Sequence, residues 1–293
     1  MRNIDDYLAL INDNLGKYLP GKDILQKSVI DAMEYSLAAG GKRVRPILTL
    51  AFCEACGGYV ENALPFACAV EMVHTYSLIH DDLPCMDNDF LRRGRPANHI
   101  ANGEAMALLA GDALLTRAFE VMLCDETIKL VGAEAAAMAA GCLARSIGVL
   151  GMIGGQVIDL ESEGKNLTQV ALDKMHSLKT GALITAAAKI GCIAAQANKN
   201  EILAAQSYAN SIGLAFQIMD DILDVTSTSD ELGKNVGSDL AAQKSTYVSC
   251  MGIEKSKRTV LQLTENAIKS LKVFGDKKEF LQIFAQDLSK RKR

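Results

Sequence analysis

Apolar residues recur at helical spacing in nearly every segment of the chain, and few residues are present that would break a helix. Only five of the 293 residues are prolines, and no segment shows sustained strand-like alternation. Breaks between helices are expected at residues 19–21, 56–58, 94–96, 154–155, 163–165 and 227–237, where glycine, proline and small polar residues cluster. No long linker or internal repeat divides the chain. The sequence therefore predicts a single all-α domain spanning residues 1–293.

The composition allows a large buried core and argues against several classes of function. Hydrophobic residues make up 49% of the chain and charged residues 23%. The net charge is −4 and no basic arm precedes the last few residues, so nucleic acid is not expected as a partner. The N-terminus lacks the apolar region of a signal peptide, and Lys129, Glu134, Arg145 and Lys189 keep apolar runs shorter than about 18 residues. We expect a cytoplasmic protein that does not insert into a membrane.

Two of the expected helices, residues 133–146 and 181–197, are apolar over much of their surface. Such helices are covered by other helices rather than by water. Part of this surface can also lie between subunits, so a homodimer is expected.

The eight cysteines are expected to be reduced and mostly packed as small hydrophobic residues. Cys53 and Cys56 have metal-ligand spacing, but no cysteine or histidine stands at an obvious partner spacing. Packing is therefore favoured over a zinc site.

A first acidic cluster contains Asp81, Asp82 and Asp87 and is followed by two arginines. Pro84 disfavours helix at the residue before it, so the helix should break there and allow Asp87 to return toward Asp81. Carboxylates suit Mg²⁺, and the following guanidiniums of Arg92 and Arg93 suit bidentate phosphate binding. An exposed turn of mixed charges is the alternative.

A second acidic cluster contains Asp220, Asp221 and Asp224. Asp220 and Asp224 are four residues apart, so on a helix they lie one turn apart on nearly the same face. Their neighbours are apolar, which is a poor composition for a solvated acidic face and favours a cation between the carboxylates. A solvated face remains the alternative.

Basic residues supply a third element, Gly40-Gly41-Lys42-Arg43-Val44-Arg45. It lacks the pattern of a Walker A loop, but a Gly-Gly turn before cations can bind phosphate or cap a helix. Lys179 and Thr180 precede Gly181 in a similar but weaker pattern. Carboxylates and cations in this alternation indicate a diphosphate site that is assembled through magnesium.

Together and in this order, these motifs resemble those of the trans-isoprenyl diphosphate synthases, and the similarity covers nearly the whole chain. The spacer Leu83-Pro84-Cys85-Met86 and the string from His74 to Asp82 resemble bacterial farnesyl diphosphate synthases. Phe90 is a departure, because many relatives carry a further aspartate there. It lies outside the Asp81/Asp87 pair, so the expected metal ligands are retained.

The resemblance implies a large helical bundle around a deep central cavity, with the two acidic motifs facing each other across its mouth. It implies three Mg²⁺ ions, which Mn²⁺ could replace. The expected metal ligands are Asp81, Asp82, Asp87, Asp220 and Asp224. The expected partners of the allylic diphosphate are Arg92, Lys179, Thr180, Gln217, Lys234 and Lys244, and those of isopentenyl diphosphate are Lys42, Arg45, His74 and Arg93. Catalytic roles are expected for Asp81, Asp87, Asp220, Arg92, Lys179 and Lys234.

The implied chemistry begins with ionisation of an allylic C–O bond, which leaves a carbocation and pyrophosphate. Cations in a water-poor site lower the barrier by neutralising the leaving charge. The isopentenyl double bond then attacks the carbocation, and the departing pyrophosphate is implied to take the proton. Closure would exclude water, and the basic tail at residues 289–293 either covers the phosphates or stays solvated.

Product length is expected to depend on Tyr76, with Ser77 beside it. Tyr76 lies five residues before Asp81, about 7.5 Å deeper along a helix. In the family, an aromatic residue there accompanies a C15 product and a smaller residue a C20 product. The sequence therefore predicts farnesyl diphosphate, with geranylgeranyl diphosphate as the alternative and ordinary packing of Tyr76 as a third possibility.

Other classes explain fewer motifs. A metal phosphohydrolase of the HD type would use His80-Asp81 but leaves the second acidic cluster without a role. A terpene cyclase does not need the Gly-Gly-Lys-Arg element. A non-catalytic partner subunit would be expected to lose one acidic cluster, and this chain keeps both.

Overall fold

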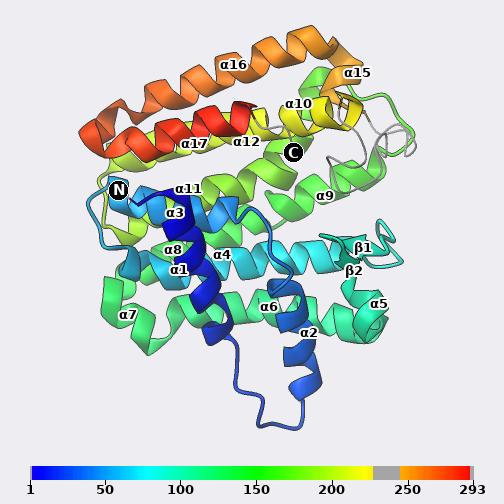
Figure 1. The fold of residues 1–293 in the computed structure, drawn as a ribbon, viewed down its shortest axis with the longest axis vertical. Helices are drawn as coiled ribbons and strands as arrows, with labels where there is room; N and C mark the ends of the chain where they lie inside the picture. Colours follow the sequence, from blue (N-terminus) through cyan, green and yellow to red (C-terminus); the bar gives the residue numbers. More distant parts are fainter. Residues whose placement is uncertain (1, 227–244, 291–293) are drawn as a thin grey trace.

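Helix α4 (Val60–Asp81) is buried along most of its length, and other helices pack around it (Figure 1). The computed structural model describes residues 2–226 and 245–290. Helices α3 (Val44–Ala55), α6 (Glu104–Leu123) and α11 (Ala182–Ala194) pack against α4. The all-α class predicted from the sequence is confirmed.

The remaining helices complete the bundle in chain order. They are α1 (Ile4–Leu15), η1 (Gly16–Tyr18), α2 (Lys27–Leu37), α5 (Asn98–Asn102), α7 (Asp125–Val131), α8 (Ala133–Ile147), α9 (Met152–Glu161), α10 (Gln169–His176), η2 (Ser177–Gly181), α12 (Lys199–Thr226), α15 (Tyr247–Met251), α16 (Ile253–Ser270), η3 (Leu271–Lys278) and α17 (Glu279–Lys290).

Two hydrophobic clusters hold these helices together. The larger is centred on α3, α4, α6, α8 and α11, where Phe52, Phe66 and Leu183 are fully buried. The smaller joins α10, α12, α15 and α16 around Ile218 and Tyr247. Helix α12 contributes to both clusters, so it fixes the acidic segment at its end relative to the centre of the bundle.

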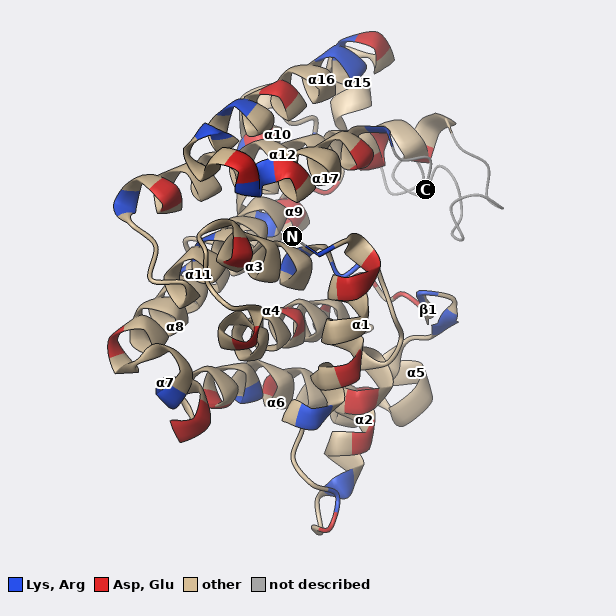
Figure 2. Ribbon diagram, turned by 60° about the vertical axis from the view of Figure 1, so that its left-hand side comes forward, with Lys and Arg blue, Asp and Glu red and all other residues tan. Residues whose placement is uncertain are grey.

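Within residues 2–226 and 245–290, a short hairpin is the exception to the helical pattern. Strands β1 (Leu91–Arg92) and β2 (Arg95–Pro96) pair antiparallel. Arg93 and Gly94 form the turn with φ of 54° and 73°. This left-handed backbone is typical of tight hairpin turns. Figure 2 shows acidic and basic residues interspersed over the ribbon, with basic residues on this hairpin.

The predicted break at residues 154–155 is wrong. Helix α9 runs through both glycines, and the chain breaks earlier, between α8 and α9 at residues 148–151. Close packing explains the glycine at position 155, because a Cβ there would lie 2.1 Å from the backbone nitrogen of Lys179.

Two helical stretches, Ala133–Glu161 and Gln169–Ala194, are long and apolar enough by length and composition to cross a membrane. This differs from the expectation that charges keep every apolar run short. Core helices of soluble proteins pass the same test, and 61% of the apolar window of the second stretch is buried in the bundle. The first stretch is interrupted at residues 148–151.

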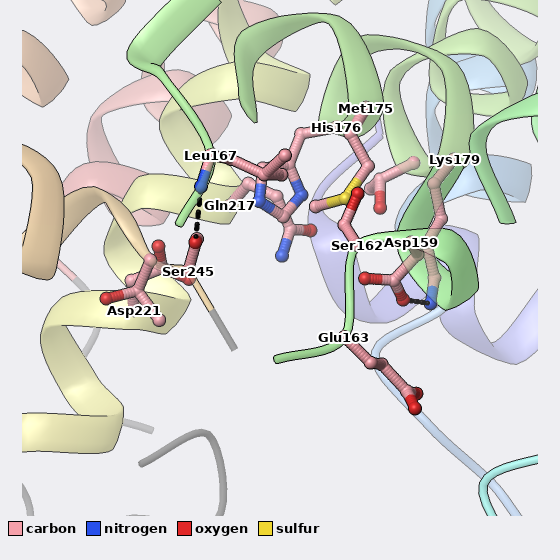
Figure 3. A pocket seen from close by; sticks show the side chains of 12 residues that line it. Asp159, Ser162, Glu163, Leu167, Met175, His176, Lys179, Gln217, Asp221 and Ser245 are labelled. Atoms are coloured by element: carbon pink, nitrogen blue, oxygen red, sulfur yellow. Dashed lines mark hydrogen bonds and ion pairs between the residues drawn. The ribbon is translucent and has the colours of Figure 1, made fainter. Parts of the chain in front are cut away.

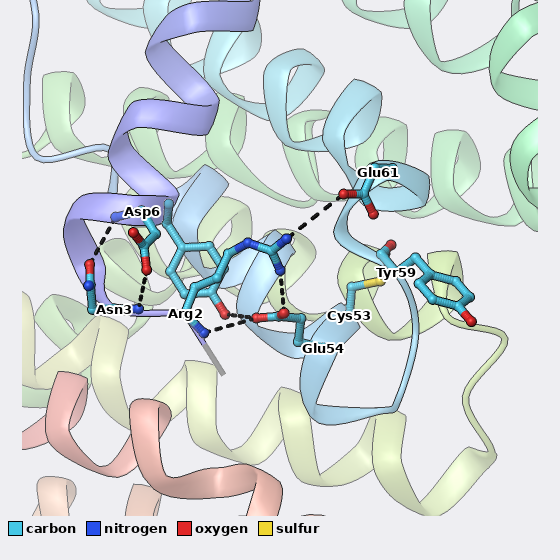
Figure 4. A network of polar contacts seen from close by, with 8 residues as sticks. Arg2, Asn3, Asp6, Cys53, Glu54, Tyr59 and Glu61 are labelled. Atoms are coloured by element: carbon cyan, nitrogen blue, oxygen red, sulfur yellow. Dashed lines mark hydrogen bonds and ion pairs between the residues drawn. The ribbon is translucent and has the colours of Figure 1, made fainter.

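The N-terminus is tied to the far end of α3, as Figure 4 shows. Asn3 and Asp6 form a capping box at the start of α1. The Glu54 carboxylate accepts hydrogen bonds from Arg2 and from the Tyr7 hydroxyl. Nearby, Cys53 is buried and its thiol donates to the carbonyl of Tyr59. Cys53, Cys68, Cys142 and Cys192 are buried in the bundle, whereas Cys85 and Cys250 are exposed.

Candidate active site

The first acidic motif begins where α4 ends. Helix α4 stops at Asp81, and the Asp87 N–H donates to the Asp81 carbonyl over 2.9 Å. The predicted return of Asp87 toward Asp81 is therefore confirmed. Burial raises the pKa of the Asp81 carboxyl to about 6, Lys179 opposes this shift, and Asp87 adds to it. A nearby cation would restore the charged form of Asp81.

Asp82, next to Asp81 in the chain, is paired with Arg92. Its buried carboxylate accepts the Arg92 Nε over 2.9 Å, and the Arg92 Nη2 also pairs with Asp82 and with Asp89. Two contacts from one guanidinium fix its plane. Arg92 is thereby held at the start of the hairpin, close enough to Asp81 to affect its pKa.

The Gly-Gly-Lys-Arg loop lies directly against Arg93. Gly40 and Gly41 have φ of 79° and 123°, and the Arg93 guanidinium donates to the Gly40 carbonyl. A Cβ on Gly41 would lie 2.6 Å from the Arg93 Cζ. Both glycines have a positive φ that most other residues rarely adopt, and the Arg93 side chain packs directly against Gly41. Lys42 is exposed next to this contact.

Arg45 and His74 meet between α3 and α4. The Arg45 Nη1 lies 3.4 Å from the His74 Nε2. Because a guanidinium only donates, this nitrogen of His74 accepts. Burial, then Arg45 and Arg93, lower the pKa of His74 well below its usual value, so the ring is neutral. Burial also lowers the pKa of Arg45 to about 10, and the carboxylates of Glu71 and Asp220 oppose that shift.

The second acidic motif lies on the last turns of α12, as the spacing predicts. Asp220 is half-buried and influences Arg45, whereas Asp224 is 3% exposed. Asp221 accepts the backbone N–H of Tyr247 over 2.6 Å. Asp221 thus fastens α15 to α12, and Asp220 lies on the side of the arginines.

Lys179 lies on a π-helical turn, η2, between α10 and α11. Turns of this kind are rare overall, but where they occur they often lie at functional sites. The Lys179 Nζ donates to the Asp159 Oδ2 over 2.6 Å, which joins η2 to α9. Lys179 also lowers the pKa of Asp81, so this cation is near the first acidic motif as well as paired with α9.

A polar pocket of about 170 Å³ opens between α9, η2 and α12 (Figure 3). Gln217, one turn before Asp221, and Thr180 both line it. The full lining is Asp159, Ser162, Glu163, Leu167, Met175, His176, Lys179, Thr180, Gln217, Asp221, Ser245 and Thr246. Three predicted diphosphate partners, Lys179, Thr180 and Gln217, therefore share one pocket.

Tyr76 lies inside α4, deeper than Asp81. Its ring is 6% exposed and packs edge-on against His80 with centroids 5.6 Å apart. Its hydroxyl is buried without a hydrogen-bond partner among the described residues. Ser77 donates to the His74 carbonyl over 2.9 Å. Tyr76 is not among the residues that line the polar pocket.

The donor set suits magnesium bound partly by substrate. Among the described residues, no three carboxylate, histidine or cysteine side chains converge closely enough to hold a metal alone. Mg²⁺ usually binds through one or two carboxylates and completes its shell with water and phosphate oxygens. Asp81, with its pKa raised and Asp87 beside it, offers that kind of partial shell.

The structure does not describe every predicted site residue. Lys234, Lys244 and the last residues of the basic tail are outside the described residues. The polar segment from Gly155 to Asp159 is expected from the sequence to reach the same site, but the pairing of Asp159 with Lys179 was not predicted, and neither was the buried pair Arg43–Glu71. Both pairs join different helices, so no local spacing signals them.

Comparison with known proteins identifies the family. The polyprenyl synthetase model matches residues 26–286. The chain belongs to the polyprenyl synthetase family. It is therefore a prenyltransferase of isoprenoid synthesis, in agreement with the resemblance.

Individual members of the family are similar over nearly the whole chain. Geranylgeranyl diphosphate synthase of Cyanophora paradoxa is 48% identical over 92% of this chain and 88% of its own. The heterodimeric geranylgeranyl pyrophosphate synthase large subunit 1 of Arabidopsis thaliana is 48% identical over 92% of this chain and 73% of its own. The structure of an FPP/GFPP synthase from Zymomonas mobilis superposes with a TM-score of 0.86 at 35% identity, covering 98% of this chain and 97% of that one.

Proposed function

We propose that this prenyltransferase condenses isopentenyl diphosphate with an allylic diphosphate in a magnesium-dependent reaction, and that geranylgeranyl diphosphate is its product. The observation that carries the proposal is the electrostatic convergence on Arg45. This arginine contacts His74 and is influenced by both Arg93 and Asp220. The Gly-Gly-Lys-Arg loop, the second acidic motif and the hairpin that follows the first acidic motif thus meet near Arg45.

The residues divide between two diphosphates. Lys179, Thr180 and Gln217 share a polar pocket next to Asp81, which suits the allylic diphosphate. The cations Arg45 and Arg93 and the neutral ring of His74 form a neighbouring group between α3, α4 and the hairpin, which suits isopentenyl diphosphate. Two adjacent diphosphate sites are what a condensation of two isoprenoid units requires.

Asp81, Asp87 and Asp220 would hold magnesium, with Asp224 behind Asp220 and Asp82 engaged by Arg92. The ion, when bound, neutralises the charge that develops on the leaving pyrophosphate. Arg92 and Lys179 add cationic groups near Asp81, where low water content would strengthen their effect. Lys234 and Lys244 are proposed to join them, and Mn²⁺ is a plausible substitute metal.

The product length rests on two opposing observations. The relatives named geranylgeranyl diphosphate synthases, at 48% identity, favour a C20 product over the C15 product expected from the motifs. Tyr76, a buried aromatic ring about one and a half turns before Asp81, favours farnesyl diphosphate as the second candidate. We further propose a cytoplasmic homodimer.

The test is incubation of the chain with Mg²⁺, isopentenyl diphosphate and either dimethylallyl, geranyl or farnesyl diphosphate, followed by sizing of the dephosphorylated products. Elongation of farnesyl diphosphate to C20 supports the main proposal. Accumulation of C15 with no use of farnesyl diphosphate supports the second candidate. Absence of condensation with every starter refutes both.

A further inference from the structure

Arg43 stands inside the Gly-Gly-Lys-Arg element, yet it points away from the exposed side of the loop. It is 4% exposed and occupies the N-cap of α3 with φ of 48°. Its guanidinium donates to the Leu37 carbonyl and to the Glu71 Oε1, both over 2.6 Å, and to the Asn12 Oδ1 over 3.3 Å. One side chain therefore ties α1, the end of α2 and α4 to the start of α3.

Glu71 is the buried anion of this cluster. Its side chain is 1% exposed, and its Oε2 has no hydrogen-bond partner among the described residues. A buried carboxylate of this kind is costly unless cations surround it. Besides Arg43, it acts on Arg45 and on Arg93.

The position of the pair relates it to the proposed isopentenyl diphosphate site. Arg43 lies between Lys42 and Arg45 in the chain, and Glu71 lies one turn before His74 on α4. Fixing Arg43 therefore also restrains the backbone at Lys42 and Arg45. Fixing Glu71 places a negative charge among the arginines that surround His74.

We propose that Arg43 and Glu71 are positioning residues for the isopentenyl diphosphate site, setting the orientation of Lys42 and Arg45 without touching the substrate. This inference rests on the proposed function, since it assigns the pair to one of its two substrates. An ordinary structural ion pair would behave differently. Its loss would affect folding and would not selectively weaken the binding of either substrate.

The decisive variant is Arg43→Met/Glu71→Met, which removes both charges together and leaves no unpaired buried ion. The KM for isopentenyl diphosphate is expected to rise by about 10-fold, the loss expected when a charged hydrogen bond no longer orients a binding group. The KM for the allylic diphosphate is expected to stay unchanged. Arg43→Lys keeps the charge but cannot reach three acceptors at once, so an intermediate KM is expected.

A matched control is Arg2→Met/Glu54→Met, which removes another arginine–glutamate pair at the opposite end of α3. Both KM values of this control are expected to equal those of the wild type. Direct titration of isopentenyl diphosphate by calorimetry, without allylic substrate, should show the same loss of affinity in the Arg43/Glu71 variant.

The outcomes separate the inference from the proposed function. Wild-type protein that binds isopentenyl diphosphate but catalyses no condensation would refute the function, and the calorimetric comparison would still decide the role of the pair. Equal affinity in wild type and double variant, equal loss for both substrates, or no binding by the wild type would overturn the inference. If the double variant does not fold, Arg43→Lys decides: a wild-type KM for isopentenyl diphosphate would overturn it.

Discussion

Tyr76 carries the question of product length because its ring is buried against His80 and its hydroxyl makes no hydrogen bond to the described residues. Removing the ring would open space for a growing isoprenoid chain beside the part of α4 that precedes Asp81. We expect Tyr76→Ala to lengthen the main product by at least one five-carbon unit, measured by chromatography. Tyr76→Phe is the control, because it keeps the ring and should keep the product length. Identical products from the alanine variant would exclude Tyr76 as the floor.

His176 gives a pH dependence of stability whose sign follows from its environment. Burial lowers the pKa of His176 from 6.5 to about 4, and Asp159 partly opposes this shift. The unfolded chain therefore takes up a proton below pH 6.5 that the folded chain refuses, so stability falls as the pH falls from 6.5 to 4. The loss amounts to at most about 3 kcal/mol.

Urea unfolding of wild type and His176→Gln at several pH values tests this effect. The difference in unfolding free energy between the two proteins should shrink as the pH falls from 6.5 to 4 and stay constant above pH 7. Asp81 has a raised pKa, which makes stability change with pH in the opposite direction. Asp81 is present in both proteins, so its effect cancels in the difference. A pH-independent difference would show that His176 is not buried in the neutral form.

At the scale of elements, the contact between α9 and the π-helical turn η2 places Lys179. A Cβ on Gly155 would lie 2.1 Å from the Lys179 nitrogen and 2.5 Å from its Cα. Backbone atoms cannot yield as a flexible side chain can, so Gly155→Ala should separate α9 from η2. We expect kcat to fall by about 10²-fold, as for other small displacements of catalytic groups.

Gly141→Ala, on α8, is the matched control for Gly155→Ala. A Cβ there would meet only the flexible side chain of Arg145, at 3.3 Å. Its activity should equal that of the wild type, and its stability should rise slightly because alanine favours helix. Full activity in Gly155→Ala would contradict the proposed role of this contact.

How far the sequence predicts these elements depends on the range of the interaction. The end of α4 at Asp81 and the return of Asp87 follow from Pro84, because proline acts on its immediate neighbours. The break at residues 154–155 was predicted wrongly because Gly155 serves a neighbour 24 residues away in the chain. Arg43–Glu71 and Lys179–Asp159 could not be predicted for the same reason, since each joins distant segments.

At the scale of the whole molecule, exposed apolar side chains favour the proposed homodimer. Leu109 on α6 and Met138 on α8, two helices in contact, are about half exposed. Contiguous exposed apolar surface is typical of subunit interfaces, and the contact between α6 and α8 brings the two exposed faces together. Analytical ultracentrifugation should give twice the 31.4 kDa of one chain. Leu109→Lys/Met138→Lys should lower the dimer fraction, whereas Leu261→Lys on α16 should not; a concentration-independent monomer would refute the proposal.

The central claim is that the two acidic motifs act together on one diphosphate. Its most direct test is the steady-state kcat of Asp81→Asn and Asp220→Asn with saturating substrates and Mg²⁺, compared with Asp13→Asn on α1. Each of the first two variants should lose about 10²–10³-fold in kcat, because each weakens the stabilisation of the leaving charge. The Asp13 variant should match the wild type. Wild-type turnover in either Asp81→Asn or Asp220→Asn would contradict the account.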